Sequence, residues 1–173
     1  ILPGGESTTM RIASSHEGLL KALYDWMVAN PLIPVLGTCA GAILLCSPTD
    51  DYTPFLDAII SRNAWGRQAA SFQAPLSISL DAEVMISAPP RVILTDGVHR
   101  PISVENSEPS VAETFPGIFI RAPRFSSVGA KSTVVAELGD GEVVGVRQDS
   151  RIGLTFHPEL TSDHRFHRWI ISK

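Results

Sequence analysis

A cysteine lies between two glycines at the end of a short apolar run, in the stretch Gly37-Thr38-Cys39-Ala40-Gly41. The residues before it, 33–36, predict a short buried strand, and the residues after it, 42–46, predict the start of a helix. A tight strand-to-helix turn forces its central residue into an unusual backbone conformation, and flanking glycines remove Cβ atoms that would clash. The first amides of the helix and its positive dipole end then favour a thiolate. The pattern predicts either a nucleophile elbow that presents Cys39 or a small buried cysteine beside packing glycines.

The N-terminal half of the chain predicts alternating strands and helices. The first residues read as the end of a strand and a glycine turn, and 5–9 offer a helix N-cap. The stretch 16–30 has apolar residues at helical spacing and ends at Pro31. Strand, helix, strand and helix in this order predict an α/β fold with a parallel sheet and right-handed crossovers.

The C-terminal half is richer in strands. Short β-like runs are predicted at 57–61, 76–80, 92–95, 118–121, 133–138, 143–148 and 151–156. Gly139-Asp140-Gly141 predicts a hairpin turn, and 163–173 predict a closing helix with Phe166, Trp169 and Ile170 on one face. The stretch 87–116 is rich in proline, serine and glutamate and predicts a long surface excursion.

Composition narrows the function classes. The net charge of −4 and the lack of a basic patch argue against a nucleic-acid partner recognised by bulk electrostatics. No apolar run is long enough to span a bilayer, and the first five residues lack the features of a signal peptide. Cys39 and Cys46, if both on one helix, lie about 10 Å apart, too far for a disulfide. Two unpaired thiols suggest a reducing compartment, and we expect a cytoplasmic location.

A thiolate nucleophile needs a proton carrier, and Phe156-His157-Pro158-Glu159 offers one. In an extended segment, residues two apart project to the same side, so Glu159 is placed to fix the tautomer of His157. The segment follows an apolar strand, and ligands bind at the carboxyl ends of strands in open α/β sheets. The alternative is a loop histidine with an incidental glutamate.

His164 and His167, with His157 and Glu159, raise the question of a metal site. The set lacks a recognisable zinc spacing, and Arg165 and Arg168 would repel a cation. A solvated helix face is the favoured interpretation, and we expect no metal.

A second glycine turn, Pro3-Gly4-Gly5-Glu6-Ser7, precedes the first predicted helix. Two successive glycines let backbone amides approach a ligand closely, so an anion or carbonyl oxygen fits there. Taken alone the signal is weak, because many turns share it.

The combination of these segments is more specific than any one of them. "LPGGESTTM" at 2–10, "GTCAG" at 37–41, "SRNAWGRQAASF" at 61–72, "IFIRAP" at 118–123 and "FHPELTSDHR" at 156–165 resemble the glutaminase subunit of pyridoxal 5′-phosphate synthase. That subunit belongs to the class I, or triad, glutamine amidotransferases. The resemblance covers the chain from its first residue to the final helix, except for about 81–114, which is expected to be a surface insertion.

The resemblance implies a fold and a site. The fold would be a three-layer, flavodoxin-like α/β domain with a mostly parallel central sheet. Cys39 would be the nucleophile, His157 the proton carrier and Glu159 its partner, and the amides of Gly5 and Ala40 would form the oxyanion hole. The residues implied to bind L-glutamine are Gly5, Glu6, Ser7, Arg62, Ile120 and Arg121, with Arg67 as the alternative to Arg62.

The implied activity is glutamine hydrolysis through a cysteinyl thioester without a cofactor. The ammonia would pass to a partner synthase subunit, which is a (β/α)8 barrel, in a heteromeric complex of vitamin B6 biosynthesis. Two alternatives stay open. One is a non-catalytic regulatory or assembly subunit, and the other is a stand-alone γ-glutamyl hydrolase on the same fold.

Two departures from the family pattern carry expectations of their own. Chains of the family begin about 30 to 45 residues earlier, roughly one βαβ unit. We therefore expect 1–173 to be a single domain that lacks its first βαβ portion, poorly stable and weakly active in isolation. Within the excursion, Val84, Met85, Ile86, Val92, Ile93 and Leu94 are apolar enough to predict a small hairpin.

Overall fold

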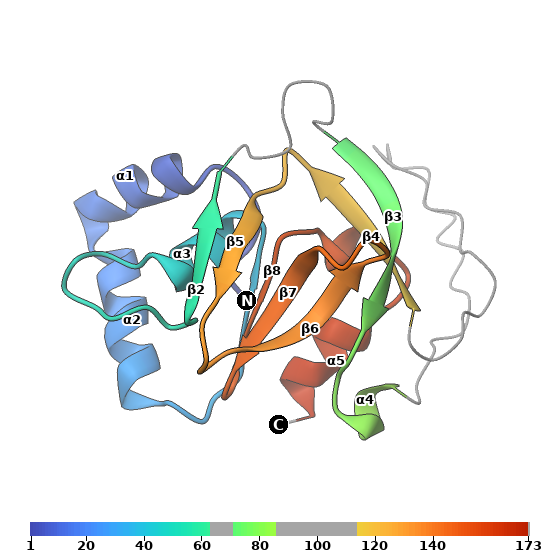
Figure 1. Ribbon diagram of the computed structural model, residues 1–173. Helices are drawn as coiled ribbons and strands as arrows, with labels where there is room; N and C mark the ends of the chain where they lie inside the picture. The colour runs from blue at the N-terminus through green and yellow to red at the C-terminus, as the bar shows by residue number, and fades with distance from the viewer. Residues whose placement is uncertain (63–70, 86–113, 173) are drawn as a thin grey trace, which may run out of the picture.

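The computed structural model of the chain describes residues 1–62, 71–85 and 114–172 (Figure 1). Its helices are α1 (Ser7–Glu17), α2 (Leu19–Ala29), α3 (Ala40–Cys46), α4 (Ala82–Met85), the 3-10 turn η1 (Pro158–Leu160) and α5 (Arg165–Ile171). Its strands are β1 (Val35–Thr38), β2 (Ala58–Ser61), β3 (Ser71–Ile78), β4 (Thr114–Ile120), β5 (Arg124–Val128), β6 (Thr133–Leu138), β7 (Val143–Gln148) and β8 (Arg151–Leu154). The predicted runs at 133–138 and 143–148 match β6 and β7 and are confirmed.

The central sheet has six strands in the order β1-β8-β7-β6-β3-β4, and β2 pairs with β5 in a separate antiparallel ribbon. Only β1 and β8 of these named strands run parallel, with Leu2 bridged in parallel to Gly37 on the other side of β1. The other four pairings of the six-stranded sheet are antiparallel. The prediction of a mostly parallel sheet is therefore wrong, and the sheet is mixed.

Short connections explain two of the four antiparallel pairings, β6–β7 and β7–β8. The turn at 139–142 joins β6 to β7, and Asp149-Ser150 joins β7 to β8. A connection of a few residues permits only antiparallel pairing, because a parallel pair needs a crossover of about a dozen residues or more. Asp149 adopts a φ of 52°, as tight hairpin turns require.

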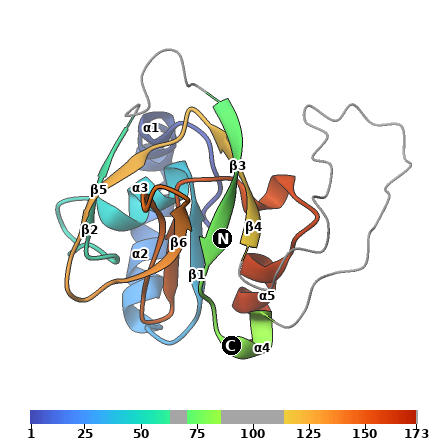
Figure 2. The ribbon, with the colours of Figure 1, turned by 45° about the vertical axis from the view of Figure 1, so that its right-hand side comes forward.

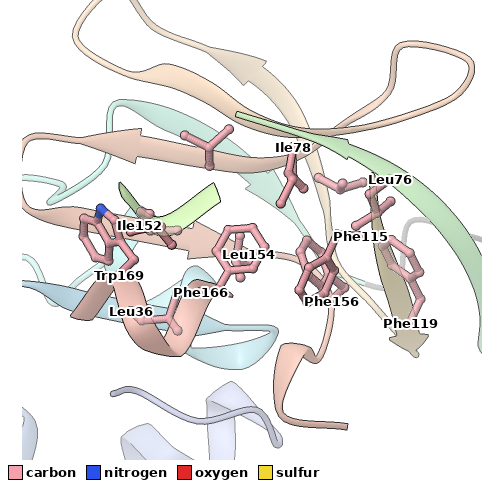
Figure 3. Packing of buried hydrophobic residues seen from close by; sticks show 14 of the residues in the cluster. Leu36, Leu76, Ile78, Phe115, Phe119, Ile152, Leu154, Phe156, Phe166 and Trp169 are labelled. Atoms are coloured by element: carbon pink, nitrogen blue, oxygen red, sulfur yellow. The ribbon is translucent and has the colours of Figure 1, made fainter. Parts of the chain in front are cut away.

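Helices cover both faces of the sheet and form three layers (Figure 2). On one face, α2 and α3 pack against strand residues in a cluster that contains Leu20, Tyr24, Met27, Leu44, Leu45 and Val146. On the other face, α4 and α5 close a cluster that includes Val84, Phe166 and Trp169 (Figure 3). None of the helices in the described ranges is long and apolar enough to cross a membrane.

The predicted helix over 16–30 corresponds to α2, and residues 16 and 17 are the end of a separate helix, α1. α1 ends where Gly18 adopts a left-handed conformation, φ 68°, and donates its amide to the carbonyl oxygen of Ser14. The Ser14 hydroxyl then accepts the amide of Leu20 at 2.6 Å and so caps the start of α2. The apolar periodicity predicted α2, and the N-cap predicted within 5–9 matches Glu6 at the start of α1, which carries few apolar residues.

Other boundaries also differ from the predictions. Residues 114–116 belong to β4, and Phe115 is fully buried, so this end of the predicted surface excursion is wrong. Ala82–Met85 form a helical turn with Val84 buried, not the start of a hairpin. The strand β5 was not predicted at all. The run predicted at 92–95 and the residues Ile86, Val92, Ile93, Leu94 and Arg67 lie outside the described residues.

Candidate active site

Cys39 occupies the turn between β1 and α3 with φ 50° and ψ −106°. This positive φ is rare for a residue with a side chain and is the conformation expected of a nucleophile elbow. The Cys39 amide donates to the carbonyl oxygen of Leu154 at 2.8 Å, which ties the turn to the neighbouring parallel strand β8. The Cys39 side chain is mostly buried and lines a pocket.

The two glycines that flank Cys39 are packing positions. A Cβ on Gly37 would lie 2.7 Å from the backbone of Gly41, and a Cβ on Gly41 would lie 2.1 Å from the carbonyl oxygen of Leu2. The two interpretations of the motif are therefore compatible, because the glycines allow close backbone packing while the turn presents the thiol.

His157 lies just beyond the carboxyl end of β8, next to Glu159. The His157 amide donates to the carbonyl oxygen of Ile118 at 2.8 Å, which fixes its backbone against β4. Its Nδ1 lies 2.8 Å from Oε1 of Glu159. The sequence interpretation assumed an extended segment, whereas η1 turns the chain here and brings the carboxylate to the ring.

The electrostatics of this pair favour an imidazolium. Burial alone lowers the pKa of His157, but hydrogen bonds and charge interactions with Cys39 and Glu159 outweigh it and raise that pKa to about 9. Burial raises the pKa of Glu159, but the hydrogen bond from His157 and its charge hold that pKa below its usual value. The Cys39 thiol, the imidazole and the carboxylate therefore interact in series.

A pocket of about 460 Å³ opens beside Cys39 and His157. Its lining comprises Gly5, Glu6, Ser7, Cys39, Ile43, Arg62, Ile120, Arg121, Pro123 and His157. All six residues that the resemblance assigned to glutamine binding are in this set. Ala40 is buried at the start of α3 and, like Glu159, is not part of the lining.

Two lining residues were missed by the sequence analysis. Ile43 lies one helical turn after Cys39 on α3, so its i+4 spacing was a signal that could have placed it on the same helix face. Pro123 is the last residue of the IFIRAP string, which was used only as far as Arg121.

The mouth of the pocket is organised around the start of α1. Glu6 caps this helix by accepting the amides of Thr8 at 3.1 Å and Thr9 at 2.5 Å, and these hydrogen bonds hold its pKa down at about 2. Arg62, at the end of β2, donates from Nη1 to Oγ1 of Thr8 at 2.5 Å, and the same nitrogen lies 3.8 Å from Oε1 of Glu6. A cation and an anion therefore lie side by side at the pocket.

Comparison with known proteins places the chain in a family. A sequence profile described as the SNO glutamine amidotransferase family matches residues 1–106 and 94–173. The chain belongs to the SNO glutamine amidotransferase family. It is 39% identical over 176 residues to the pyridoxal 5'-phosphate synthase subunit PdxT of Bifidobacterium adolescentis, covering 99% of this chain and 80% of that protein. It is 37% identical to the PdxT subunit of Thermococcus gammatolerans, covering 100% of this chain and 75% of that one.

Two solved structures superpose on this SNO family chain. A crystal structure described as a glutamine amidotransferase superposes with a TM-score of 0.70 at 33% identity, covering 98% of this chain and 75% of that chain. A putative GMP synthase protein from Thermoplasma acidophilum superposes with a TM-score of 0.56 at 14% identity, covering 98% of this chain and 69% of its own. This second likeness concerns the fold alone.

The histidines at the C-terminal end of this SNO family chain do not form a metal centre in the described part of the structure. No group of three or more His, Cys, Asp or Glu side chains there could hold an ion. His164 is exposed, whereas the neighbouring Arg165 is buried and forms an ion pair with Asp163 at 2.6 Å. His167 is half-buried. Burial is the main cause that lowers its pKa, and the charge of His164 lowers it further.

The second cysteine differs from Cys39 in its surroundings. Cys46 is buried in the core beneath α2, and burial raises its pKa to about 12. Both cysteines are free. A thiol with so high a pKa stays protonated and is a poor nucleophile.

Proposed function

We propose that this chain hydrolyses the side-chain amide of L-glutamine and supplies the ammonia to a pyridoxal 5′-phosphate synthase subunit. The observation that carries the proposal is a series of three interacting groups, of which Cys39 and His157 line the pocket. Cys39 occupies a strained elbow, the pKa of His157 is raised to about 9, and Nδ1 of His157 lies 2.8 Å from Glu159. Cys39 is the nucleophile, His157 is the proton carrier, and Glu159 is the carboxylate that orients the histidine.

In the first half of the reaction, the Cys39 sulfur attacks the amide carbon of glutamine. A C–S bond forms, and the carbonyl oxygen takes the negative charge within reach of the Gly5 and Ala40 amides. His157, which takes up the thiol proton, gives it to the amide nitrogen as the C–N bond breaks. Ammonia leaves, and a thioester to glutamate stays on Cys39.

In the second half, water replaces the nitrogen. Neutral His157 removes a proton from the water, the new C–O bond forms, and the C–S bond breaks to release glutamate and restore the thiol. Glu159 keeps Nδ1 of His157 hydrogen-bonded in both halves, so the opposite ring nitrogen is the one that exchanges protons.

The amino-acid end of glutamine would bind at the mouth of the pocket. The guanidinium of Arg62 suits the α-carboxylate, and the Glu6 carboxylate suits the α-ammonium group. Ile120 and Arg121, from the end of β4, would complete the opposite wall. These assignments follow from charge and position at the pocket.

The destination of the ammonia is proposed from the relatives. Proteins 37–39% identical to this chain are subunits of pyridoxal 5'-phosphate synthase. We infer that this chain also docks on a (β/α)8 synthase barrel and passes ammonia to it.

The test measures glutamate and ammonia released from L-glutamine by the purified chain, alone and with a synthase barrel. We expect turnover that rises when the barrel is added and that disappears in Cys39→Ala. Turnover that does not respond to the barrel would favour a stand-alone γ-glutamyl hydrolase. Binding to the barrel without turnover would favour a non-catalytic subunit, and either result would overturn the proposal.

A further inference from the structure

One residue that touches the reacting pair has no role in the proposed mechanism. Gly4 is half-buried and precedes the turn that lines the pocket. A Cβ built on Gly4 would lie 2.4 Å from Cε1 and 3.1 Å from Nδ1 of His157, and 3.4 Å from Cβ of Cys39. The first distance is far shorter than any tolerated contact, whereas the last is an ordinary one. The bare Cα of Gly4 therefore lies close to the Cε1 and Nδ1 atoms of the imidazole.

The backbone of Gly4 needs no glycine for its own conformation. Its φ lies outside the left-handed range, unlike that of Gly5, whose φ is 142°. The φ of Gly4 is therefore no obstacle to an alanine at this position. Among the described residues, the severe obstacle to a side chain at this position is the ring of His157.

Gly4 cannot retreat from the ring. Two residues earlier, Leu2 donates its amide to Leu36 at 2.8 Å and accepts the amide of Thr38 at 3.0 Å, which pins the strand end to β1. Two residues later, Glu6 is fixed by its cap on α1. A new side chain at Gly4 must therefore be accommodated by its neighbour.

The His157 backbone is fixed as well, through its amide bond to Ile118. Its side-chain torsions are the soft degrees of freedom, since rotation about them costs far less than breaking the strand contacts. A methyl group at Gly4 would push the ring away from Cys39 and Glu159 while leaving the fold in place.

We propose that Gly4 is a positioning residue, whose missing side chain holds the imidazole of His157 in line between Cys39 and Glu159. The proposal rests on the proposed function for its catalytic consequence, but the steric relationship stands without it. A displacement of about 1 Å at a reacting group can reduce the rate by about 100-fold.

The matched control is Gly139→Ala. Gly139 lies in the turn between β6 and β7, its φ is not left-handed, and a Cβ there would meet nothing within 4 Å. Both substitutions therefore add one methyl group to a glycine whose φ lies outside the left-handed range. A second comparison, Gly41→Ala, forces a Cβ to within 2.1 Å of the Leu2 carbonyl oxygen and should damage the fold itself.

The experiment measures kcat and KM for glutamine, urea unfolding, and the imidazole titration of His157 by NMR. In Gly4→Ala we expect kcat to fall by about 100-fold or more with KM changed by less than about threefold. The pKa of His157 should fall from about 9 toward its usual value of 6.5, because the ring loses its hydrogen bonds. Gly139→Ala should match the parent chain in all three. Unchanged kcat and an unchanged His157 titration in Gly4→Ala would overturn the proposal.

A double-mutant cycle decides the case even if Gly4→Ala unfolds or the parent chain is inactive. In a His157→Ala background the ring is gone, so Gly4→Ala should leave the urea midpoint unchanged. If Gly4→Ala lowers the midpoint equally in both backgrounds, the clash does not involve His157 and the proposal is wrong. An inactive parent chain would overturn the proposed function, and the cycle and the titration would still decide the role of Gly4.

Discussion

Thr38 and Leu154 are register partners at the carboxyl ends of β1 and β8, the two parallel strands of the sheet. The backbone leaves the sheet at this edge after both strands. After β1 it enters the elbow at Cys39, and after β8 it runs toward His157. The pocket lies where they emerge, and its walls come from the start of α1 and the end of β4. The parallel pairing of β1 with β8 thus brings Cys39 and His157, which are far apart in the sequence, to the same edge of the sheet.

Replacement of Glu159 by glutamine removes the negative partner of His157 and keeps its size. The pKa of His157 is raised to about 9 partly by Glu159, so this pKa should fall in the variant. The imidazolium is then lost at a lower pH, and the alkaline limb of the kcat profile should move to lower pH. We expect kcat to fall by about 10- to 100-fold, less than a complete loss of acid–base catalysis. Glu17→Gln on the exposed side of α1 is the control, and a matching pH profile in Glu159→Gln would contradict the assignment.

Replacement of Arg62 by glutamine removes the cation at the pocket mouth. A hydrogen bond to a charged group contributes about 1.5–3 kcal/mol, which corresponds to about a 10- to 100-fold weaker interaction. We expect KM for glutamine to rise by that factor while kcat changes much less. Lys21→Gln removes the same charge from the surface of α2, and its KM should be unchanged. An unchanged KM in Arg62→Gln would show that the arginine serves only to tie Thr8 to β2.

The contribution of His157 to stability should depend on pH in a stated direction. Its pKa in the folded chain, about 9, lies above the ordinary value of 6.5, so its contribution is fully present below pH 6.5. This contribution is lost as the pH rises through about 9. A pKa shift of one unit corresponds to about 1.4 kcal/mol, so His157 contributes at most about 3 kcal/mol to the free energy of unfolding. The difference in unfolding free energy between the parent chain and His157→Gln should therefore shrink from pH 6.5 to 9 in urea titrations. A difference that grows over that range would contradict the electrostatic account, and His16→Gln is the exposed control.

Phe156 links the core to the site. Its ring lies 5.6 Å from that of Phe166 and 5.7 Å from those of Phe115 and Phe119, and it is fully buried directly before His157. Phe156→Ala should reduce the free energy of unfolding by about 3–5 kcal/mol, because it leaves a cavity among these rings. Leu32→Ala removes a side chain that is 87% exposed and should change stability by less than about 0.5 kcal/mol. Equal effects of the two changes would mean that the aromatic cluster does not support this edge of the sheet.

Local patterns predicted the local structure well. The hairpin at Gly139–Gly141 and its two strands follow from alternation and turn residues, and both are confirmed. The direction of the other strands depends on which segments meet, and no local signal states that β3 pairs antiparallel with both β4 and β6. β5 was missed because its stretch Arg-Phe-Ser-Ser-Val buries only Phe125, which leaves almost no apolar alternation.

Local sequence patterns predicted only part of the candidate site. The elbow at Cys39 follows from its glycines, and the neighbourhood of His157 follows from the strand before it. The placement of Arg62, Ile120 and Arg121 beside them came from the resemblance, because their segments meet only in the folded sheet. Gly4 gave no sign of its contact with His157, since a glycine that touches a side chain looks in sequence like any turn glycine.

The central claim is that Cys39 acts as a nucleophile toward the side-chain amide of glutamine. The most direct measurement is mass spectrometry of the chain after treatment with a diazo-ketone analogue of glutamine. We predict one adduct per chain on the peptide that holds Cys39, prevented by excess glutamine, absent in Cys39→Ala and retained in Cys46→Ala. An adduct on Cys46, or a Cys39 that stays unmodified with the synthase barrel present, would contradict the account.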